Sequence, residues 1–268
     1  MTRLTEADVA GLMRDLAAFE AGLDEVAGLD LRGLALRTAT DDAVCVQLHG
    51  ARIATVPVSS GQGFIPGFGE CVTAILGHLG CEAWVTAQPD VRGLQEAVGA
   101  GADVVFMADD FRFVALNLAK ARCVDDDPAT ADGYVTALDA AARGLLDRRV
   151  LLLGLGPVGR AAARRLVSRG AKVAVVELDD EQFAAARETG LRIERTDLAE
   201  GLSRCDLVFD ATPAADLIDA GDLLPGTIAA VPGLPSAFTA AAREELGARH
   251  IHEPLAVGVA VMAARALL

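Results

Sequence analysis

The chain has 268 residues, of which 52% are hydrophobic and 23% are charged, and its formal net charge at pH 7 is −14. This composition is typical of globular proteins, and the length allows one large domain or two smaller ones that each bury a core. The negative charge and the lack of a basic stretch argue against DNA or RNA as a partner, because phosphates would be repelled.

Cysteine usage and the N-terminal segment indicate the compartment. The five cysteines form no CxxC pair and no spacing typical of zinc ligands, so we expect most to be buried apolar side chains in a reducing environment. The N-terminal segment is acidic and amphipathic, and no apolar run reaches the roughly 18 residues that a membrane span needs. We expect a soluble, cytoplasmic protein with no membrane partner.

Helical and extended patterns alternate along the first half of the chain. Residues 6–27 have apolar residues at helical spacing, and residues 31–50 are less regular. Three apolar strands then each precede a helical pattern. The pairs are RIATVPV with FGECVTAILGHLG, EAWVTA with VRGLQEAVGAG, and DVVFMADD with FRFVALNLAK. This alternation predicts a small α/β domain with a largely parallel sheet.

The segment CVDDDPATADG (123–133) interrupts this pattern, and its aspartates and Pro128 predict a solvated linker. A helix then leads to four apolar strands, RRVLLLGLG, AKVAVVELDD, DLVFDATP and TIAAVPGLP. We therefore predict an α/β protein. A smaller, helix-rich α/β substrate domain (1–126) precedes a doubly wound, Rossmann-type NAD-binding domain (127–268). The last helix, PLAVGVAVMAARALL, is expected to pack inside the fold and could cross back onto the first domain.

A dinucleotide fingerprint follows the strand RVLLL. Gly154, Gly156 and Gly159 fit GxGxxG, which supplies a tight turn, a close backbone approach to pyrophosphate, and close packing of helix on strand. Pro157 and Val158 open the helix, where amide hydrogens without helical partners would face the pyrophosphate.

The ends of the later strands complete the predicted cofactor site. Glu177 ends the next strand, 18 residues after Gly159, where its carboxylate can accept hydrogen bonds from the ribose hydroxyls. Asp179 and Asp180 would repel a 2′-phosphate, which favours NAD over NADP. The remaining predicted cofactor residues are Thr212, Pro213, Pro232 and Gly233, at the ends of the third and fourth strands.

Several acids and histidines could take part in substrate chemistry. Asp109 closes the strand DVVFM and is either a functional acid or part of a solvated turn, whereas Asp110 could be the N-cap of a helix over 111–120. Glu253 is a helix-start acid or a functional one. His250 and His252 alternate on a short strand but have no evident third ligand, so no metal site is predicted.

Six segments resemble the pyrrolysine synthase (PylD) family in order along nearly the whole chain. They are PVSSGQGFIPGFGE, VFMADDFRFVALNLAK, LLLGLGPVG, DATPAAD, VPGLPSA and HEPLAVGVAVM. The resemblance implies a homodimeric, NAD-dependent enzyme that acts on a small molecule, lysine-linked 3-methylornithine. The terminal amine carbon would be oxidised, ammonia would be released, and the resulting aldehyde would cyclise to pyrrolysine.

The resemblance also implies site residues. Asp109 and Glu253 would be the catalytic acids at the polar ends of the ligand, and the glycine-rich turn at 57–70 would approach a slender ligand. The implied substrate-binding residues are Leu4, Ser59, Ser60, Phe68 and Asp126. Asp125-Asp126-Asp127 stands where the family pattern has an asparagine before the proline, which removes a donor and adds charge.

Two other functions are consistent with the same sequence. The chain could be an NAD-dependent dehydrogenase of the same architecture that acts on a different amino acid or diamine. It could also be a non-catalytic NAD sensor. Reduction of NAD by lysine-linked methylornithine would separate the first function from the second, and the lack of any turnover would favour the third.

Overall fold

The structure is a computed structural model that describes residues 6–40 and 46–268, and its internal contacts divide the chain into two compact units. Unit 1 contains Ala18–Asp30 and Ala131–Pro254. Unit 2 contains Leu31–Thr130 and Leu255–Leu268, together with the described part of Arg3–Ala17. The units therefore do not follow a single cut near residue 126, since each is assembled from segments far apart in the sequence.

Unit 1 has a six-stranded parallel sheet in the order β11-β10-β9-β6-β7-β8. Its strands are β6 (Arg149–Leu153), β7 (Lys172–Val176), β8 (Ile193–Arg195), β9 (Leu207–Asp210), β10 (Ile228–Val231) and β11 (His250–His252). The four apolar strands and the doubly wound order predicted from the sequence are confirmed, as is the short strand at His250. The three-residue strand β8 was not predicted, because Glu194 and Arg195 are exposed and give it no apolar run.

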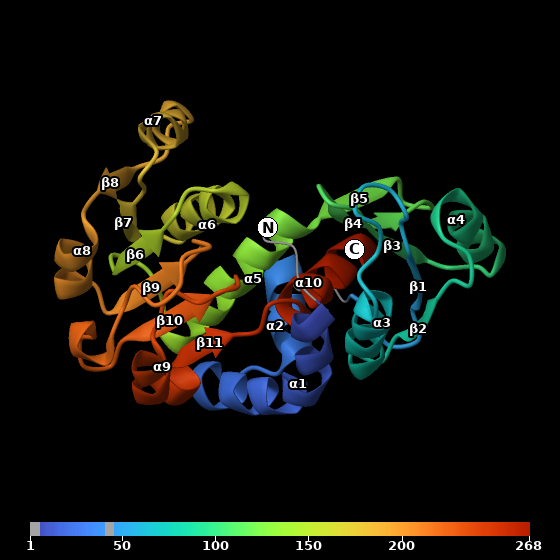
Figure 1. The fold of residues 1–268 in the computed structure, drawn as a ribbon, viewed down its shortest axis with the longest axis horizontal. Helices are drawn as coiled ribbons and strands as arrows, with labels where there is room; N and C mark the ends of the chain where they lie inside the picture. The colour runs from blue at the N-terminus through green and yellow to red at the C-terminus, as the bar shows by residue number, and fades with distance from the viewer. Residues whose placement is uncertain (1–5, 41–45) are drawn as a thin grey trace. The chain divides into compact units, whose positions relative to one another are not determined.

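Helices cover both faces of the unit 1 sheet. Unit 1 contains the helices α6 (Pro157–Ser168), α7 (Asp180–Glu188), α8 (Leu198–Arg204) and α9 (Ala240–Leu246), and parts of α1 (Glu6–Ala27) and α5 (Asp126–Ala141). Leu151 and Leu153 pack in one core cluster with Leu202 of α8 and Leu246 of α9. Side chains alternate between the faces of a strand, so Leu152 points to the opposite face. In Figure 1, α6 lies on the side of the sheet away from α8 and α9.

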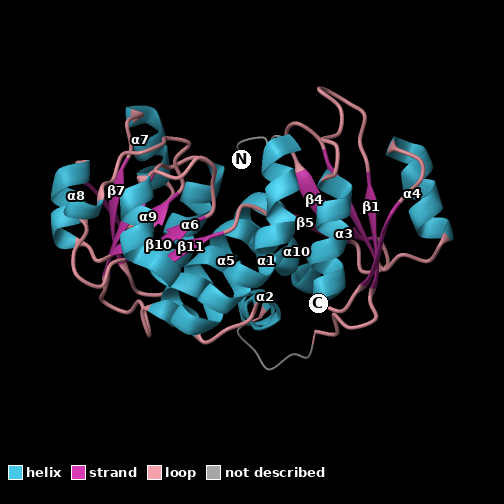
Figure 2. Ribbon diagram, turned by 60° about the horizontal axis from the view of Figure 1, so that its bottom comes forward, coloured by secondary structure: helices cyan, strands magenta, loops and turns pink. Residues whose placement is uncertain are grey.

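Unit 2 has a five-stranded mixed sheet in the order β2-β1-β3-β4-β5. The strands are β1 (Arg52–Val56), β2 (Glu82–Val85), β3 (Val104–Ala108), β4 (Phe113–Asn117) and β5 (Arg122–Asp125). The helices are α2 (Leu31–Ala39), α3 (Phe68–His78), α4 (Asp90–Gly99) and α10 (Ala256–Leu267). Figure 2 shows α4 on one side of the sheet and α3 and α10 on the other. Ala54, Val56 and Val105 of the sheet form one buried cluster with Ala97 of α4.

The helix predicted over 111–120 is wrong, because this segment forms β4 and the turn after it. β4 pairs antiparallel with β3 and with β5, so the sheet is mixed rather than largely parallel. Phe113, Ala115 and Asn117 alternate with Val114 and Leu116, which is the two-residue period of a strand. Asp110 consequently lies in a hairpin turn and caps no helix.

The solvated linker predicted at 123–133 is also wrong. β5 extends to Asp125, and α5 begins at Asp126 without an intervening loop. Proline is tolerated in the first turn of a helix, and acidic residues there interact favourably with the helix dipole, so Asp126, Asp127 and Pro128 form a helix start. Asp126 is buried, with 4% of its surface exposed.

The C-terminal helix α10 belongs to unit 2, where it packs against α2, α3 and β4. Nearly all of its residues are buried, which confirms the expectation that it packs inside the fold. Within the described residues, no helix has the length and apolar character needed to cross a membrane. Gly258 lies where α10 meets α5, and a Cβ there would overlap the side chains of Thr130 and Asp126.

We predict that Gly258→Ala lowers the free energy of unfolding by about 1–3 kcal/mol, since an added methyl group overpacks this contact. Urea-unfolding curves provide the measurement. Gly77→Ala in α3 is the matched control, because no atom lies within 4 Å of its added Cβ. The control is expected to stabilise the protein by up to about 1 kcal/mol through helix propensity. Equal effects of the two substitutions would contradict the packing argument.

Candidate functional site

The glycine-rich turn after β6 depends on two close backbone contacts. Gly154 has φ 84°, a left-handed conformation that side chains disfavour, and its N–H donates to Val176 O at 2.9 Å. A Cβ on Gly159 would overlap the carbonyl of Gly154, so α6 approaches β6 this closely only with glycine. The residues of the fingerprint thus form the strand–turn–helix that the motif requires.

The start of α6 provides an open cradle for an anion. Gly156 is the N-cap of α6, and a Cβ placed on it would meet no atom within 4 Å. Pro157 is exposed at the first helical position and Val158 is half-buried behind it. Free backbone N–H groups and open space at a helix N-terminus fit the pyrophosphate of a dinucleotide.

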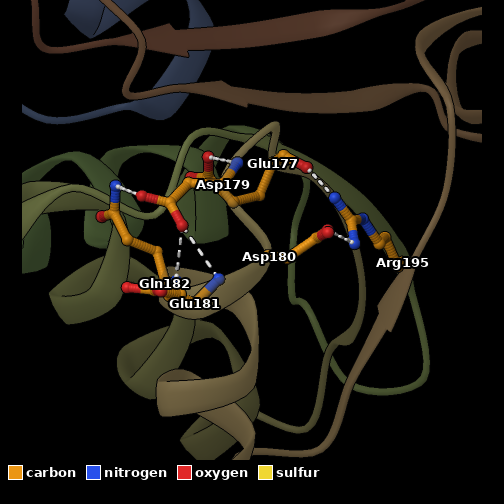
Figure 3. Close-up of polar contacts among 6 residues, drawn as sticks. All are labelled: Glu177, Asp179, Asp180, Glu181, Gln182 and Arg195. Atoms are coloured by element: carbon orange, nitrogen blue, oxygen red, sulfur yellow. Dashed lines mark hydrogen bonds and ion pairs between the residues drawn. The ribbon is translucent and has the colours of Figure 1, made fainter.

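Glu177 follows β7 and fixes the shape of this region (Figure 3). One carboxylate oxygen accepts a hydrogen bond from Leu155 N at 2.6 Å, and the other accepts from Asp179 N at 2.8 Å. Asp179 caps α7 by accepting from the N–H groups of Glu181 and Gln182, which hold the pKa of its carboxyl below the usual value. The predicted ribose acid therefore lies beside the glycine turn.

The ends of β9 and β10 lie next to the same turn. A Cβ on Gly154 would be 3.0 Å from Ala211 O and 3.5 Å from Thr212 Cα, and one on Gly233 would be 3.8 Å from Thr212 O. Pro213 is exposed and Pro232 is buried. The predicted cofactor residues of unit 1 thus all follow carboxyl ends of neighbouring parallel strands, where doubly wound folds bind their ligands.

Asp210 is a buried acid that the sequence analysis missed. Its carboxylate accepts hydrogen bonds from Thr212 N at 3.1 Å and Ala237 N at 2.8 Å, so it connects the loops after β9 and β10. Burial raises the pKa of Asp210 to about 6, against the opposing effect of these two N–H donors. Its position at a strand end, like that of Glu177, is the signal that could have identified it.

His250 and His252 lie side by side on β11, with ring centres 5.3 Å apart. His252 Nδ1 donates to Val231 O at 2.8 Å, and His250 Nε2 lies 3.3 Å from Ser236 Oγ. Burial lowers the pKa of both imidazoles, that of His250 to about 3, so both are neutral. In the part of the chain that the structure describes, no three histidine, cysteine or acidic residues gather as metal ligands would.

In unit 2, the glycine-rich loop after β1 is held by two aspartates. Ser59 donates to the carboxylate of Asp90 through its N–H at 2.8 Å and its hydroxyl at 2.5 Å. Asp110 accepts from Gln62 N at 2.8 Å, and a Cβ on Gly61, whose φ is 66°, would overlap its carboxylate. Ser60 is exposed next to this contact. The glycines of this loop permit a tight turn against an acid.

Asp109 lies at the tip of the β3–β4 hairpin. Its Oδ1 accepts hydrogen bonds from Phe111 N at 2.8 Å and Arg112 N at 2.7 Å, and these donors hold its pKa below the usual value. Phe68, at the start of α3, is half-buried, and its ring meets that of Phe113 edge-on at 5.4 Å. Asp109 is therefore a carboxylate that stays ionised at neutral pH.

Asp126 lies at the same edge of the unit 2 sheet, because β5 runs in the direction of β3. Its Oδ1 accepts from Thr130 Oγ1 at 2.9 Å, whereas its buried Oδ2 has no hydrogen-bond partner within the described residues. Burial raises the pKa of Asp126 to about 7, opposed by the Thr130 hydrogen bond and reinforced by the charges of Asp127 and Asp125. Leu4, predicted to line the substrate pocket, lies outside the described residues.

Glu253 directly follows β11 and is buried, with 4% of its surface exposed. The Tyr134 hydroxyl accepts from Glu253 N at 2.8 Å and donates to Glu253 O, so it holds the backbone on both sides of this acid. Burial and the nearby charge of Glu253 raise the pKa of Tyr134 well above its usual value, so Tyr134 is a neutral donor. No sequence pattern indicates this pair, because 119 positions separate the two residues.

Two solved structures share the fold. Quinate dehydrogenase from Corynebacterium glutamicum in complex with NAD has a TM-score of 0.54 and 14% identity, covering 82% of this chain and 94% of that chain. Shikimate 5-dehydrogenase from Thermus thermophilus in complex with NADP(H) and shikimate has a TM-score of 0.52 and 19% identity, covering 81% and 93%. At such low identity these similarities establish the fold alone.

The sequence comparisons define the family. A family model described as "Pyrrolysine biosynthesis protein PylD, N-terminal domain" matches residues 8–124, and one described as "Putative NAD(P)-binding" matches residues 141–220. Pyrrolysine synthase of Methanosarcina acetivorans is 33% identical over 98% of both chains. That of Methanosarcina barkeri is 32% identical over 98% of this chain and 97% of its own. The chain is a nicotinamide-dependent dehydrogenase, and it belongs to the pyrrolysine synthase family.

Proposed function

We propose that this protein oxidises the terminal amine carbon of lysine-linked 3-methylornithine with NAD and so forms pyrrolysine. The observation that carries the proposal is the end-to-end similarity to two pyrrolysine synthases, at 33% and 32% identity over 98% of the chain. The open cradle at Gly156 and the acid at Glu177 support a dinucleotide cofactor. A cytoplasmic homodimer is part of the same proposal, from the family resemblance.

The proposed reaction has three balanced steps. The CH₂–NH₃⁺ end of the substrate loses a proton and then a hydride to become an iminium ion, CH=NH₂⁺, with NAD as the hydride acceptor. Water adds to the iminium ion, and the carbon–nitrogen bond then breaks to give an aldehyde and an ammonium ion. The α-amine of the ornithine part condenses with the aldehyde, releases water and closes the ring. The protein's contribution is to orient the amine, accept its proton and hold the reacting carbon in place.

Asp109 and Glu253 are proposed to have different roles, binding of a substrate ammonium and acceptance of a proton. The N–H groups of Phe111 and Arg112 make Asp109 a weak base, so it suits an anionic anchor for a substrate ammonium. Glu253 is buried and its backbone is held by Tyr134, which suits the group that accepts a proton. Ser59, Ser60 and Phe68 would contact the remainder of the ligand at the carboxyl edge of the unit 2 sheet.

Asp126 is proposed to stand in for the asparagine of the family pattern both in its position and in its hydrogen-bonding capacity. With a pKa of about 7, a large fraction of this carboxyl is protonated near neutrality, and the protonated group is an uncharged donor and acceptor like an amide. The buried Oδ2 without a partner is the atom that a substrate group would meet.

NAD rather than NADP is proposed as the cofactor. Glu177 stands at the end of the second strand of the doubly wound sheet, and both of its carboxylate oxygens are fixed by backbone N–H groups. Such a fixed carboxylate can accept hydrogen bonds from ribose hydroxyls and repels a 2′-phosphate. Asp179 and Asp180 add to the negative charge there.

The direct test incubates the protein with NAD and lysine-linked 3-methylornithine. We expect absorbance at the wavelength of NADH to rise, ammonia to be released in equal amount, and mass spectrometry to identify the cyclised product. Lysine, ornithine and simple diamines serve as comparison substrates. Reduction of NAD by a diamine but not by the methylornithine conjugate would favour a dehydrogenase with another substrate, and binding of NAD without any turnover would favour a sensor.

We predict that Asp109→Asn lowers kcat/KM roughly 10- to 100-fold, the effect of losing one charged hydrogen bond, while the Kd for NAD stays unchanged. Asparagine keeps an oxygen for the N–H groups of Phe111 and Arg112, so the hairpin turn is retained. Asp103→Asn is the control, because Asp103 accepts from Arg52 N at the opposite edge of the sheet. A loss of NAD binding in Asp109→Asn would assign this residue to the fold or the cofactor site instead.

Asp126 is predicted to make stability depend on pH. Its folded pKa of about 7 lies above the ordinary value of 3.8, so its contribution to stability is complete below pH 4 and is lost as pH rises through 7. Asp126→Asn removes this dependence, and urea midpoints at pH 5 and pH 8 should differ less in the variant than in the wild type. Asp24→Asn, at an exposed site of α1, controls for loss of a carboxylate. An unchanged pH dependence in Asp126→Asn would refute the assignment.

A further inference from the structure

Arg195, at the end of β8, lies beside the acid predicted to bind the ribose (Figure 3). Its Nη2 donates to the carbonyl oxygen of Glu177 at 2.7 Å, and its Nη1 lies 2.5 Å from Asp180 Oδ1. The guanidinium carbon is 5.3 Å from the centre of the Phe183 ring. Three different contacts thus hold one cationic side chain next to Glu177.

This arrangement combines two features that usually distinguish dinucleotide sites. An acid at the end of the second strand binds the ribose hydroxyls of NAD, whereas an arginine nearby binds the 2′-phosphate of NADP. Here both residue types are present. Arg195 presents its planar guanidinium, which suits bidentate binding of phosphate, but Asp180 already occupies its Nη1.

The ion pair between Arg195 and Asp180 contributes little to the stability of the fold. The side chains of Arg195 and Asp180 are 41% and 85% exposed, and exposed pairs contribute little to stability. The Glu177 carbonyl and the Phe183 ring hold Arg195 in place by contacts that do not involve Asp180. The consequence of Asp180 is therefore electrostatic, because it cancels the positive charge that would attract a 2′-phosphate.

We propose that Asp180 is a specificity-determining residue that excludes NADP by neutralising Arg195, a latent anchor for a 2′-phosphate. This inference rests on the proposed cofactor site and deepens it: Glu177 binds the ribose and repels a 2′-phosphate, and Asp180 neutralises the arginine that would otherwise offset this repulsion. Without Asp180, Arg195 keeps its contacts with the Glu177 carbonyl oxygen and the Phe183 ring, and its Nη1 becomes available to the 2′-phosphate.

The test is a double-mutant cycle read by binding, independent of turnover. Dissociation constants for NAD and NADP are measured by isothermal titration calorimetry on the full chain. The proteins are the wild type, Asp180→Asn, Arg195→Gln and the double variant. The same series is repeated with Glu177→Gln, so that repulsion by Glu177 does not mask weak NADP binding. Glu181→Gln is the matched control, because it removes a charge from the same helical turn as Asp180. In the described part of the chain, Arg195 pairs with Asp180 and not with Glu181.

We expect Asp180→Asn to lower the Kd for NADP by about tenfold, the effect of one charged hydrogen bond, and to change the Kd for NAD less than twofold. Arg195→Gln should abolish that gain in the double variant, and Glu181→Gln should produce less than half of it. The inference is overturned if Asp180→Asn gains no NADP affinity in either series, or if the gain persists without Arg195. A wild type that prefers NADP, or binds neither dinucleotide, would instead overturn the proposed cofactor.

Discussion

The contact between the turn after β6 and Glu177 is the constraint on which the cofactor site depends. The turn buries the side chain of Leu155 between two glycines, Gly154 and Gly156. Its path is set by the approach of Gly159 to the Gly154 carbonyl and by the hydrogen bond from Leu155 N to the Glu177 carboxylate. One acid, Glu177, therefore shapes the backbone that is proposed to bind the pyrophosphate, and the same acid is the proposed ligand of the ribose.

Carboxylates also hold loops in place at the sheet edges of both units. Asp110 holds the glycine-rich loop through Gln62 N, Asp109 closes the hairpin, and Asp210 connects two strand ends through Thr212 N and Ala237 N. Carboxyl edges of parallel strands leave backbone N–H groups of the following loops unpaired, and carboxylates satisfy them. An acid at these edges is thus a structural part of its loop before it meets any ligand.

Solvent exposure separates the acids into two chemical kinds. The exposed Asp109 and Asp179 accept backbone N–H donors and have lowered pKa values, so they are permanent negative charges. The buried Asp126 and Asp210 have raised pKa values, of about 7 and about 6, because burial disfavours the ionised form. Near neutral pH the protein therefore presents fixed charges at its loop tips and titrating carboxyls in its interior.

The amino-acid sequence by itself determined the doubly wound sheet of unit 1, the glycine turn with Glu177, and membership of the family. The sheet and the turn are local features, because apolar runs, glycine spacing and a strand-end acid are each read within about 20 residues. The family membership follows instead from six segments spread along nearly the whole chain. Only the tertiary structure decided that 113–117 is a strand, that Asp126 is buried, and that α10 returns to unit 2. A short apolar segment fits either a helix or a strand, and pairing with its neighbours β3 and β5 makes 113–117 a strand. Asp126 is buried because α10, from the end of the chain, brings Gly258 against it.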